Sequence, residues 1–270
     1  NIIWIWFSRK LYLVWYSKSI FSWLLLPISY CFWILAKLRK LGYLLGIFRT
    51  YNAPVPVVVV GNITVGGTGK TPLVVWLAQL LKEKGWRPGV VCSGYGGYSK
   101  KWPTRVSSDT SLEAVGDEAF LLFEKVVCPV VAGSRRSDCV EMLVNEYSVD
   151  VVVSDDGLQH YALERDIEIA VIDGSRRFGN ERFLPAGPLR ENKKRLDYVD
   201  FTVVKGCVSE HETGMLFEPT NLANLLNSFN QATLESFKGM TVNAVAGVGN
   251  NESFFKLLLE RGINCIPREF

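Results

Sequence analysis

The chain has 270 residues, enough for one large α/β domain or for a domain with a small appendage. Its net charge of +3 is unevenly distributed: the first fifty residues hold seven bases and no acid, so acids outnumber bases in the rest. Positive charge confined to one end disfavours a general nucleic-acid-binding function. Six scattered cysteines without C-x-x-C spacing, with only two histidines, disfavour a zinc site or a disulfide framework and suggest a reducing cytosol.

The first predicted element is an uncharged apolar segment, Ile20–Ala36, which contains Pro27. As a helix it would reach roughly 25 Å, a little short of a ~30 Å hydrocarbon core. Tryptophans and bases frame it, as at a membrane interface, and no small-residue cleavage site follows it. We therefore expect residues 1–50 to be a membrane anchor, as a single span or a half-inserted hairpin, with a buried soluble helix as the alternative. Because the chain opens at Asn1 rather than Met, we also expect it to be incomplete at one or both ends.

An alternation of short apolar runs and helical patterns follows over residues 51–210. The expected strands are Val57–Val60, Gly89–Cys92, Val130–Ala132, Val151–Ser154, Ile167–Ile172 and Phe201–Val204. The expected helices are Thr71–Lys84, Asp117–Lys125 and Ser137–Tyr147. This β-α-β rhythm predicts an α/β fold with a doubly wound, mainly parallel sheet.

The pattern changes in residues 211–270. One helix is expected first, followed by a strand at Thr241–Ala246, a helix at Glu252–Arg261 and an extended stretch at Ile263–Phe270. These elements predict a smaller C-terminal α/β lobe.

A glycine-rich loop joins the first strand to the first core helix, in the segment Val57–Pro72. Glycines let backbone N–H groups converge on phosphate oxygens with no Cβ in the way. Lys70 is placed to reach the β- and γ-phosphates, and the Thr71 hydroxyl to ligate Mg²⁺, so the core is a P-loop NTPase. Thr64 stands where the generic pattern has its first glycine. The residues expected to bind nucleotide are Thr64, Gly66, Gly67, Thr68, Gly69, Lys70, Thr71 and Pro72.

ATP is the expected nucleotide. GTPases usually read guanine with an N-K-x-D segment, and the nearest candidate here, Asn192–Asp197, has its aspartate displaced by two positions.

Polar residues cluster after the strand Val151–Ser154. Asp155 and Asp156 lie where ligands bind in α/β sheets, and with Thr71 they are the expected Mg²⁺ ligands. A helix cap or a turn is the alternative for the pair. Gln159 and His160 follow closely, and for His160 a structural role is as plausible as a functional one.

Two further segments are candidates for the site. Gly116-Asp117-Glu118 precedes a helical pattern, so its acids could serve catalysis or only cap the helix. A rigid Pro/Gly loop at 185–191 ends in Arg190 and Glu191, and it could present Arg190 to a phosphate or be a tight connection.

These segments together resemble the tetraacyldisaccharide 4′-kinases. The loop from Gly61 to Pro72, including Thr64, is similar to that family's signature. Its other motifs are resembled in the same order by Gly94-Tyr95-Gly96-Gly97, Gly116-Asp117-Glu118, Ser154-Asp155-Asp156-Gly157-Leu158-Gln159-His160, Leu184–Glu191 and Ala246-Gly247-Val248-Gly249-Asn250.

The resemblance implies a bacterial inner-membrane enzyme with its catalytic part on the cytoplasmic side. Such an enzyme uses ATP and Mg²⁺ to phosphorylate the 4′-hydroxyl of an acylated glucosamine disaccharide 1-phosphate, giving lipid IVA in lipid A biosynthesis. It implies catalytic roles for Asp117, as the acid–base residue, and for Lys70 and His160. It implies substrate contacts for Gln159, Arg190 and Glu191. The expected partners are this lipid and the surrounding membrane, with no nucleic acid and no obligate protein partner.

The chain departs from the family's pattern in places. Ser93 stands where the family usually has arginine, so no phosphate contact is carried over there. Glu181 replaces a common glycine and Asn192 a common proline. The family's Asp-His-His segment would fall after Phe270.

Other P-loop proteins are the alternatives. A membrane-recruited regulatory ATPase of the partitioning or cell-division type would carry a lysine immediately before the paired glycines, where this chain has Val65. A different small-molecule P-loop kinase or ligase with an acquired anchor is a third possibility.

Overall fold

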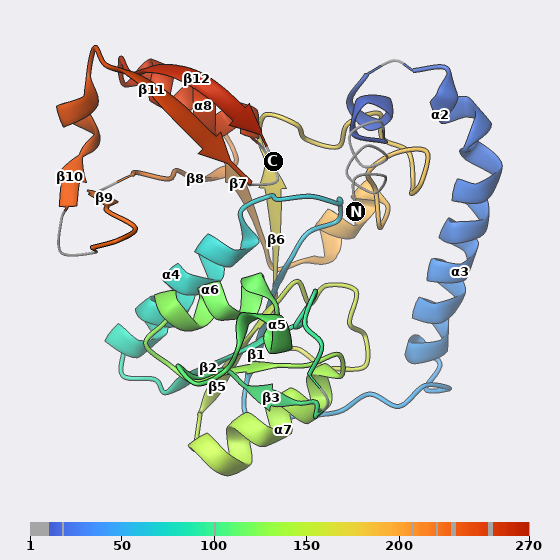
Figure 1. Ribbon diagram of the computed structural model, residues 1–270. Coiled ribbons are helices and arrows are strands. Elements are labelled where there is room, and N and C mark those ends of the chain that lie inside the picture. Colours follow the sequence, from blue (N-terminus) through green and yellow to red (C-terminus); the bar gives the residue numbers. More distant parts are fainter. Residues whose placement is uncertain are drawn as a thin grey trace. The chain divides into compact units, whose positions relative to one another are not determined.

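The computed structural model describes residues 11–17, 19–99, 101–206, 208–219, 221–227, 231–247 and 251–269 (Figure 1). The chain divides into two compact units, Asn1–Gly214 and Met215–Phe270.

The larger unit is built on a mainly parallel sheet. Its strands are β1 (Val57–Gly61), β2 (Pro88–Cys92), β3 (Thr104–Arg105), β4 (Val130–Ala132), β5 (Val151–Asp155), β6 (Ile167–Asp173), β7 (Phe201–Lys205) and β8 (Thr213–Met215). They run in the order β3-β4-β2-β5-β1-β6-β7-β8. β1 pairs in parallel with β5 and β6, and β3 is antiparallel to β4. The predicted α/β fold with a mainly parallel sheet is confirmed, each predicted strand differing from its observed one by at most one residue at an end.

Valine-rich strands and helices on both faces explain this sheet. The helices are α4 (Lys70–Glu83), α5 (Leu112–Val115), α6 (Asp117–Lys125) and α7 (Arg136–Tyr147), with a 3₁₀ helix at Lys193–Tyr198. α4 and α6 lie on one face of the sheet and α7 on the other (Figure 1). All five residues of β1, β2 and β5 are buried, as expected for parallel strands covered on both sides. The loops that follow β1 and β5 therefore meet at one edge of the sheet.

α2 (Phe21–Leu24) and α3 (Leu26–Leu44) follow a helical segment at residues 11–16 and precede the sheet in the chain. Pro27 lies in the first turn of α3, where no backbone N–H is needed. Many of their large apolar side chains face solvent: Phe21, Trp23, Leu24, Ile28, Ile34, Leu35, Leu38, Leu41 and Leu44. Among the described residues, no helix combines the length and the apolar character that crossing a membrane requires. The tryptophans at positions 4 and 6 lie outside the described residues.

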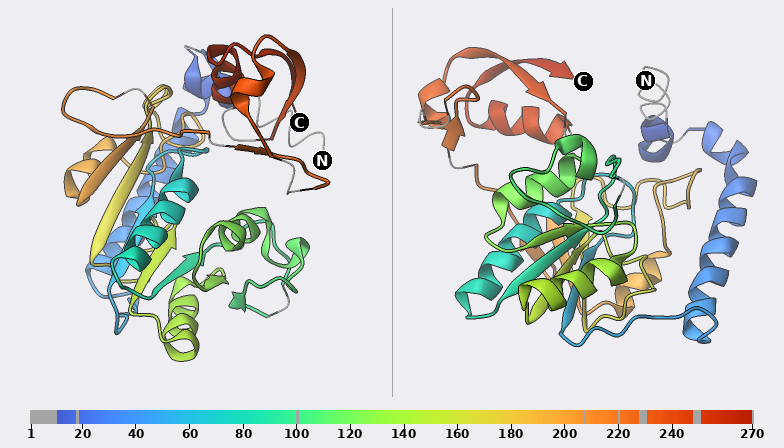
Figure 2. Two further views of the ribbon diagram at one scale, coloured as in Figure 1. Left: turned by 90° about the vertical axis from the view of Figure 1, so that its left-hand side faces the viewer. Right: turned by 60° about the horizontal axis from the view of Figure 1, so that its bottom comes forward.

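The side of α3 that is not exposed packs on residues 180–191 of the same unit. The Ala186 amide donates to Ser29 Oγ at 2.9 Å, and Arg182 donates to Ser22 Oγ at 2.7 Å. Ser22 and Ser29 are buried by this packing. α3 is therefore joined to the loop that ends in Arg190 and Glu191, and Figure 2 shows its course from a second direction.

The smaller unit has its own core. A parallel pair, β11 (Thr241–Ala246) and β12 (Asn264–Glu269), is connected by α8 (Asn251–Glu260). An antiparallel pair, β9 (Asn221–Ala223) and β10 (Gln231–Thr233), precedes it. The buried core residues are Leu234, Ala244, Ala246, Phe255, Leu258 and Ile263. Within the motif at 246–250, residues 248–250 lie outside the described residues.

The helix expected between residue 211 and Thr241 is wrong for the part of that segment the structure describes. These residues form β8, β9 and β10, and their helical content is a single 3₁₀ turn, Leu234–Phe237. The asparagines and Pro219 there favour turns and extended backbone over an α-helix.

Gly116 sets the entry into α6 and gives a test of the fold. Its φ of +84° and ψ of 161° are open essentially only to glycine, and an added Cβ would overlap the carbonyl oxygen of Tyr95. We expect Gly116→Ala to lower the free energy of unfolding by at least about 2 kcal/mol. Gly85→Ala is the control, because Gly85 shares the positive φ but has open space around it. It should cost roughly 1 kcal/mol. Equal losses in urea unfolding would show that the Tyr95 contact is unimportant.

Candidate active site

The P-loop leaves β1 at the sheet edge and ends at the first turn of α4. Gly66 and Gly69 have φ of +110° and +95°, which turns the chain back towards the helix N-terminus. The Asn62 side chain holds the loop from inside, donating from Nδ2 to Thr68 Oγ1 at 3.1 Å. Asn62 and Thr68 are buried, whereas Gly66 and Gly67 are exposed. The loop thus presents free backbone amides beside a positive helix end, the arrangement that binds phosphate.

A second loop runs alongside the P-loop and is hydrogen-bonded to it. The Val65 amide donates to the Pro188 carbonyl at 2.8 Å, and the Arg190 amide donates to the Ile63 carbonyl at 2.7 Å. Thr64 forms an isolated antiparallel bridge with Leu189. These bonds fix Arg190 beside the phosphate loop, so the Pro/Gly segment is more than a connection.

Asp156 joins the two loops electrostatically. Its carboxylate lies 3.5 Å from Lys70 Nζ and accepts from Arg190 Nη1 at 3.0 Å on both oxygens. Lys70 and Arg190 lower the pKa of Asp156 against the effect of burial. Two cations from different segments therefore lie beside the P-loop, which the sequence predicts to bind the nucleotide phosphates.

Asp155 has a different environment, and it faces Thr71. Its Oδ2 lies 3.2 Å from Thr71 Oγ1, while its buried Oδ1 has no hydrogen-bond partner. Burial, and then the charge of Glu118, raise the pKa of Asp155 to about 7. Glu118 Oε1 is itself 3.4 Å from Thr71 Oγ1. Thr71 Oγ1 therefore lies between two carboxylate oxygens, a set of oxygen atoms that suits a hard cation.

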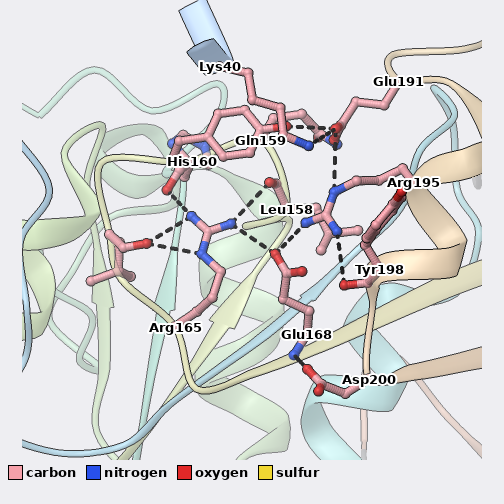
Figure 3. A network of polar contacts seen from close by, with 12 residues as sticks. Lys40, Leu158, Gln159, His160, Arg165, Glu168, Glu191, Arg195, Tyr198 and Asp200 are labelled. Atoms are coloured by element: carbon pink, nitrogen blue, oxygen red, sulfur yellow. Dashed lines mark hydrogen bonds and ion pairs between the residues drawn. The ribbon is translucent and has the colours of Figure 1, made fainter. Parts of the chain in front are cut away.

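Gln159 and Glu191 belong to a network of polar contacts (Figure 3). Gln159 Nε2 donates to Glu191 Oε1 at 2.7 Å and to the Asn62 carbonyl at 3.0 Å. Gln159 Oε1 accepts from Arg190 Nη1 at 3.2 Å. Gln159 therefore links the P-loop strand, Arg190 and Glu191 in one cluster.

His160 lies on the same loop, half-buried. Burial, followed by the charge of Arg136, lowers its pKa to about 4, so its imidazole is neutral at pH 7. It lines a cavity of about 690 Å³, together with Arg39 and Arg136. Its described hydrogen bonds involve its main chain, with Gly157, Leu163 and Arg165, and none of them joins the Asp156 cluster.

Asp117 lies apart from the cluster in its described contacts. It is exposed at the first position of α6, and its Oδ1 accepts from the Glu118 amide at 3.0 Å. This contact joins neighbouring residues of the first turn and is not an N-cap bond, because the N-cap residue of α6 is Gly116. Its carboxylate is exposed, one residue before the Glu118 that contacts Thr71, and so is accessible to an incoming hydroxyl.

Several residues of the site were not singled out from the sequence. Glu118 was left open between catalysis and helix capping with no partner named, and in the structure its Oε1 lies 3.4 Å from Thr71 Oγ1. Arg136 is buried and donates from Nη2 to the Asp155 carbonyl at 3.0 Å. Arg176 donates to the Gly67 carbonyl and pairs with Asp173 at the end of β6. The available signal was position, because these residues immediately follow strands or begin helices at the same sheet edge.

Comparison with known proteins identifies the family. The family model described as tetraacyldisaccharide-1-P 4′-kinase (LpxK) matches residues 21–270. The chain is 44% identical over 264 residues to a tetraacyldisaccharide 4′-kinase of Nitrosococcus oceani, covering 98% of this chain and 78% of that protein. It is 45% identical over 257 residues to the kinase of the same name from Coxiella burnetii, covering 95% of this chain and 76% of the relative.

A solved structure agrees with these matches. The crystal structure of LpxK from Aquifex aeolicus in complex with ATP superposes with a TM-score of 0.77 at 31% sequence identity. The match covers 93% of this chain and 82% of that one. These relatives are kinases, which does not favour the regulatory ATPase alternative. By the family model and by sequence identity over nearly its whole length, the chain belongs to the tetraacyldisaccharide-1-P 4′-kinase family.

Proposed function

We propose that this chain transfers the γ-phosphate of ATP to the 4′-hydroxyl of a tetraacyldisaccharide 1-phosphate at the cytoplasmic surface of a bacterial inner membrane. As a member of its family it is an ATP-dependent kinase of lipid A biosynthesis. The observation that carries the site assignment is the convergence of Lys70 and Arg190 on Asp156 beside an open glycine loop.

The nucleotide phosphates would occupy the P-loop. Backbone amides at Gly66–Gly69 and the N-terminus of α4 offer donors, and Lys70 offers a charge for the β- and γ-phosphates. On binding, a phosphate would compete with Asp156 for Lys70 and Arg190. Asp156 then keeps both cations oriented without ATP, which lowers the cost of organising them.

Mg²⁺ would be held by Thr71 and Asp155, where it would neutralise charge on the phosphates. The buried Asp155 Oδ1 without a partner and the two carboxylate oxygens beside Thr71 Oγ1 fit a divalent cation. Among the described residues there is no group of three or more His, Cys, Asp and Glu that could hold a metal. This is compatible with Mg²⁺, which commonly takes one or two carboxylates and completes its shell with phosphates and water. Asp156, occupied by Lys70 and Arg190, is the less suited of the two aspartates.

The transfer step needs a group that accepts the proton of the sugar hydroxyl. As the 4′-oxygen bonds to the γ-phosphorus, the bond from that phosphorus to the bridging oxygen of ADP breaks, and the hydroxyl proton passes to Asp117. Asp117 is exposed, so an acceptor hydroxyl can reach its carboxylate. Gln159, Arg190 and Glu191 would bind and orient substrate, and neutral His160 could donate or accept a hydrogen bond there.

The membrane assignment is supported by α2 and α3. Exposed apolar side chains along these helices, with Lys37 and Arg39 among them, have the composition of an interfacial helix. An acyl-chain-bearing acceptor stays in the bilayer, so the enzyme must work at its surface. This favours a helix lying in the interface over the single span considered from the sequence.

The central experiment is acceptor phosphorylation by Lys70→Ala. Vesicles containing tetraacyldisaccharide 1-phosphate are incubated with γ-labelled ATP, and the bis-phosphorylated lipid is measured. We expect kcat to fall roughly 10²–10³-fold, because the charge on the transferring phosphate loses its main partner. The control is Lys82→Ala, an exposed lysine of the same helix that donates to the Val127 carbonyl. Turnover in Lys70→Ala equal to that of Lys82→Ala would refute the assignment.

Asp117→Asn separates catalysis from capping. The asparagine Oδ1 can still accept from the Glu118 amide, so the melting temperature should stay within about 1 °C, while kcat falls about 100-fold or more if the carboxylate is the base. Glu113→Gln, at another exposed acid nearby, should leave kcat unchanged. A stability loss with normal specific activity would instead assign Asp117 to capping alone.

The membrane assignment predicts that charge on α3 releases the protein from vesicles. In the double variant Leu35→Glu, Leu38→Glu, both sites are exposed, so melting should be unaffected while vesicle affinity falls about tenfold or more. Val127→Glu, at an exposed position outside these helices, is the control. Unchanged co-sedimentation of the double variant with vesicles would place membrane affinity elsewhere.

A further inference from the structure

The carboxylate of Glu191 is surrounded by donors from three parts of the chain. Oε1 accepts from Gln159, and Oε2 accepts from the Tyr161 hydroxyl at 2.6 Å. Arg195 Nε lies 3.5 Å from Oε2, and Lys40 Nζ of α3 lies 4.0 Å from the same oxygen. Figure 3 shows Lys40 and Arg195 approaching this carboxylate from α3 and from the 3₁₀ helix.

Lys40 is held there by the end of α3. Arg39 Nη1 donates to the Gln159 carbonyl at 3.5 Å, and the Tyr43 ring lies 6.1 Å from the Tyr161 ring, centroid to centroid. Lys40 Nζ is also 5.5 Å from the centroid of the Tyr161 ring. Burial, then the charge of Arg195, lower the pKa of Lys40, while Glu191 raises it. The lysine is therefore a partly desolvated cation directed at Glu191 rather than a solvated surface charge.

An unbroken series of polar contacts runs from Lys40 to the phosphate loop. Glu191 binds Gln159, Gln159 binds Arg190, and Arg190 binds Asp156, which pairs with Lys70. Each link is a charged or amide group with directional geometry, so a shift at Glu191 changes where Gln159 presents its oxygen to Arg190.

We propose that Lys40 is a positioning residue of the phosphoryl-transfer site, which acts through Glu191 and Gln159 on Arg190. The inference rests on the proposed roles of Arg190 and Asp156 in transfer. It gives α3 a function besides membrane contact: its basic end fixes one wall of the active site. The apolar positions of α3 would contact the membrane, while its basic end holds Glu191. The packing of α3 on the larger unit would therefore contribute to catalysis.

The charge distribution gives the direction of the effect. A second partly buried carboxylate, that of Glu168, pairs with both Arg165 and Arg195. Lys40, from α3, attracts the Glu191 carboxylate electrostatically, as Arg195 does from the 3₁₀ helix. Without Lys40, the Glu191 carboxylate is expected to turn towards Arg195 and draw Gln159 with it, which weakens the hold on Arg190.

The test compares Lys40→Ala, Lys40→Arg and Lys37→Ala in the full chain. Lys37 is the control because it is an exposed lysine of the same helix, so Lys37→Ala removes the same charge. Its Nζ lies 5.1 Å from the Trp33 ring centroid, away from Glu191 in its described contacts. Acceptor is supplied in detergent micelles and, separately, in vesicles. Measured are kcat, KM for acceptor, ATP affinity and co-sedimentation with vesicles.

We expect Lys40→Ala to lower kcat roughly three- to tenfold in both micelles and vesicles, with ATP affinity and vesicle binding within about twofold of wild type. Lys40→Arg should restore most of the rate, and Lys37→Ala should leave kcat unchanged. A Lys40→Ala effect confined to KM or vesicle binding would overturn the proposal, because an anchoring lysine alone would produce it.

A double-mutant cycle tests the route. Combining Lys40→Ala with Glu191→Gln should lower kcat no further than Glu191→Gln alone, because the two residues act in series. Additive losses would overturn the route through Glu191. If the wild type phosphorylates no disaccharide, the proposed acceptor is wrong, and the same comparison is then made on ATP hydrolysis without acceptor, where an unchanged rate in Lys40→Ala overturns the inference.

Discussion

The hydrogen-bonded pairing of two loops determines the geometry of this site. Residues 63–65 of the phosphate loop and residues 188–190 of the Pro/Gly segment share backbone hydrogen bonds, and this pairing brings Arg190 to Asp156. Without it, Lys70 would face a carboxylate with no second cation, and Gln159 would lose one of its partners. Backbone bonds set the distance between the loops, so the charged side chains need little reorganisation of their own when a phosphate arrives.

Most of the large unit could be predicted from sequence because its signals are local. Runs of valine bounded by turns define parallel strands, and glycine spacing defines the phosphate loop. Asp155 and Asp156 were assigned together from their position after a strand. The structure separates them, with Asp155 facing Thr71 and Asp156 facing Lys70 and Arg190. Adjacent residues point in different directions at the end of a strand. Asp156 also has a left-handed φ of +48°, which its residue type alone does not predict.

What the sequence could not supply depends on contacts between distant segments. The sequence left Glu118 open between catalysis and capping because its local pattern is that of a helix start. Only the packing of α6 against α4 brings its carboxylate to Thr71. Likewise, the helix predicted after residue 211 was wrong. The helical periodicity is weak there, and pairing with neighbouring β-strands determines the backbone conformation. Sequence reasoning was strongest where one segment carries its own geometry.

The N-terminal helices show how one sequence pattern can serve two surfaces. Charge-free Ile20–Ala36 suggested a span, but α3 continues through Lys37, Arg39 and Lys40 to Leu44, so one helix carries both the apolar positions and the basic ones. Two buried serines, Ser22 in α2 and Ser29 in α3, accept hydrogen bonds from the loop at 182–186. A helix surrounded by lipid would not need such polar contacts. A helix in the interface can expose apolar side chains to lipid while its other side binds protein. The same loop continues to Arg190, so the helix that would contact the membrane and the wall of the phosphate site are parts of one packed arrangement.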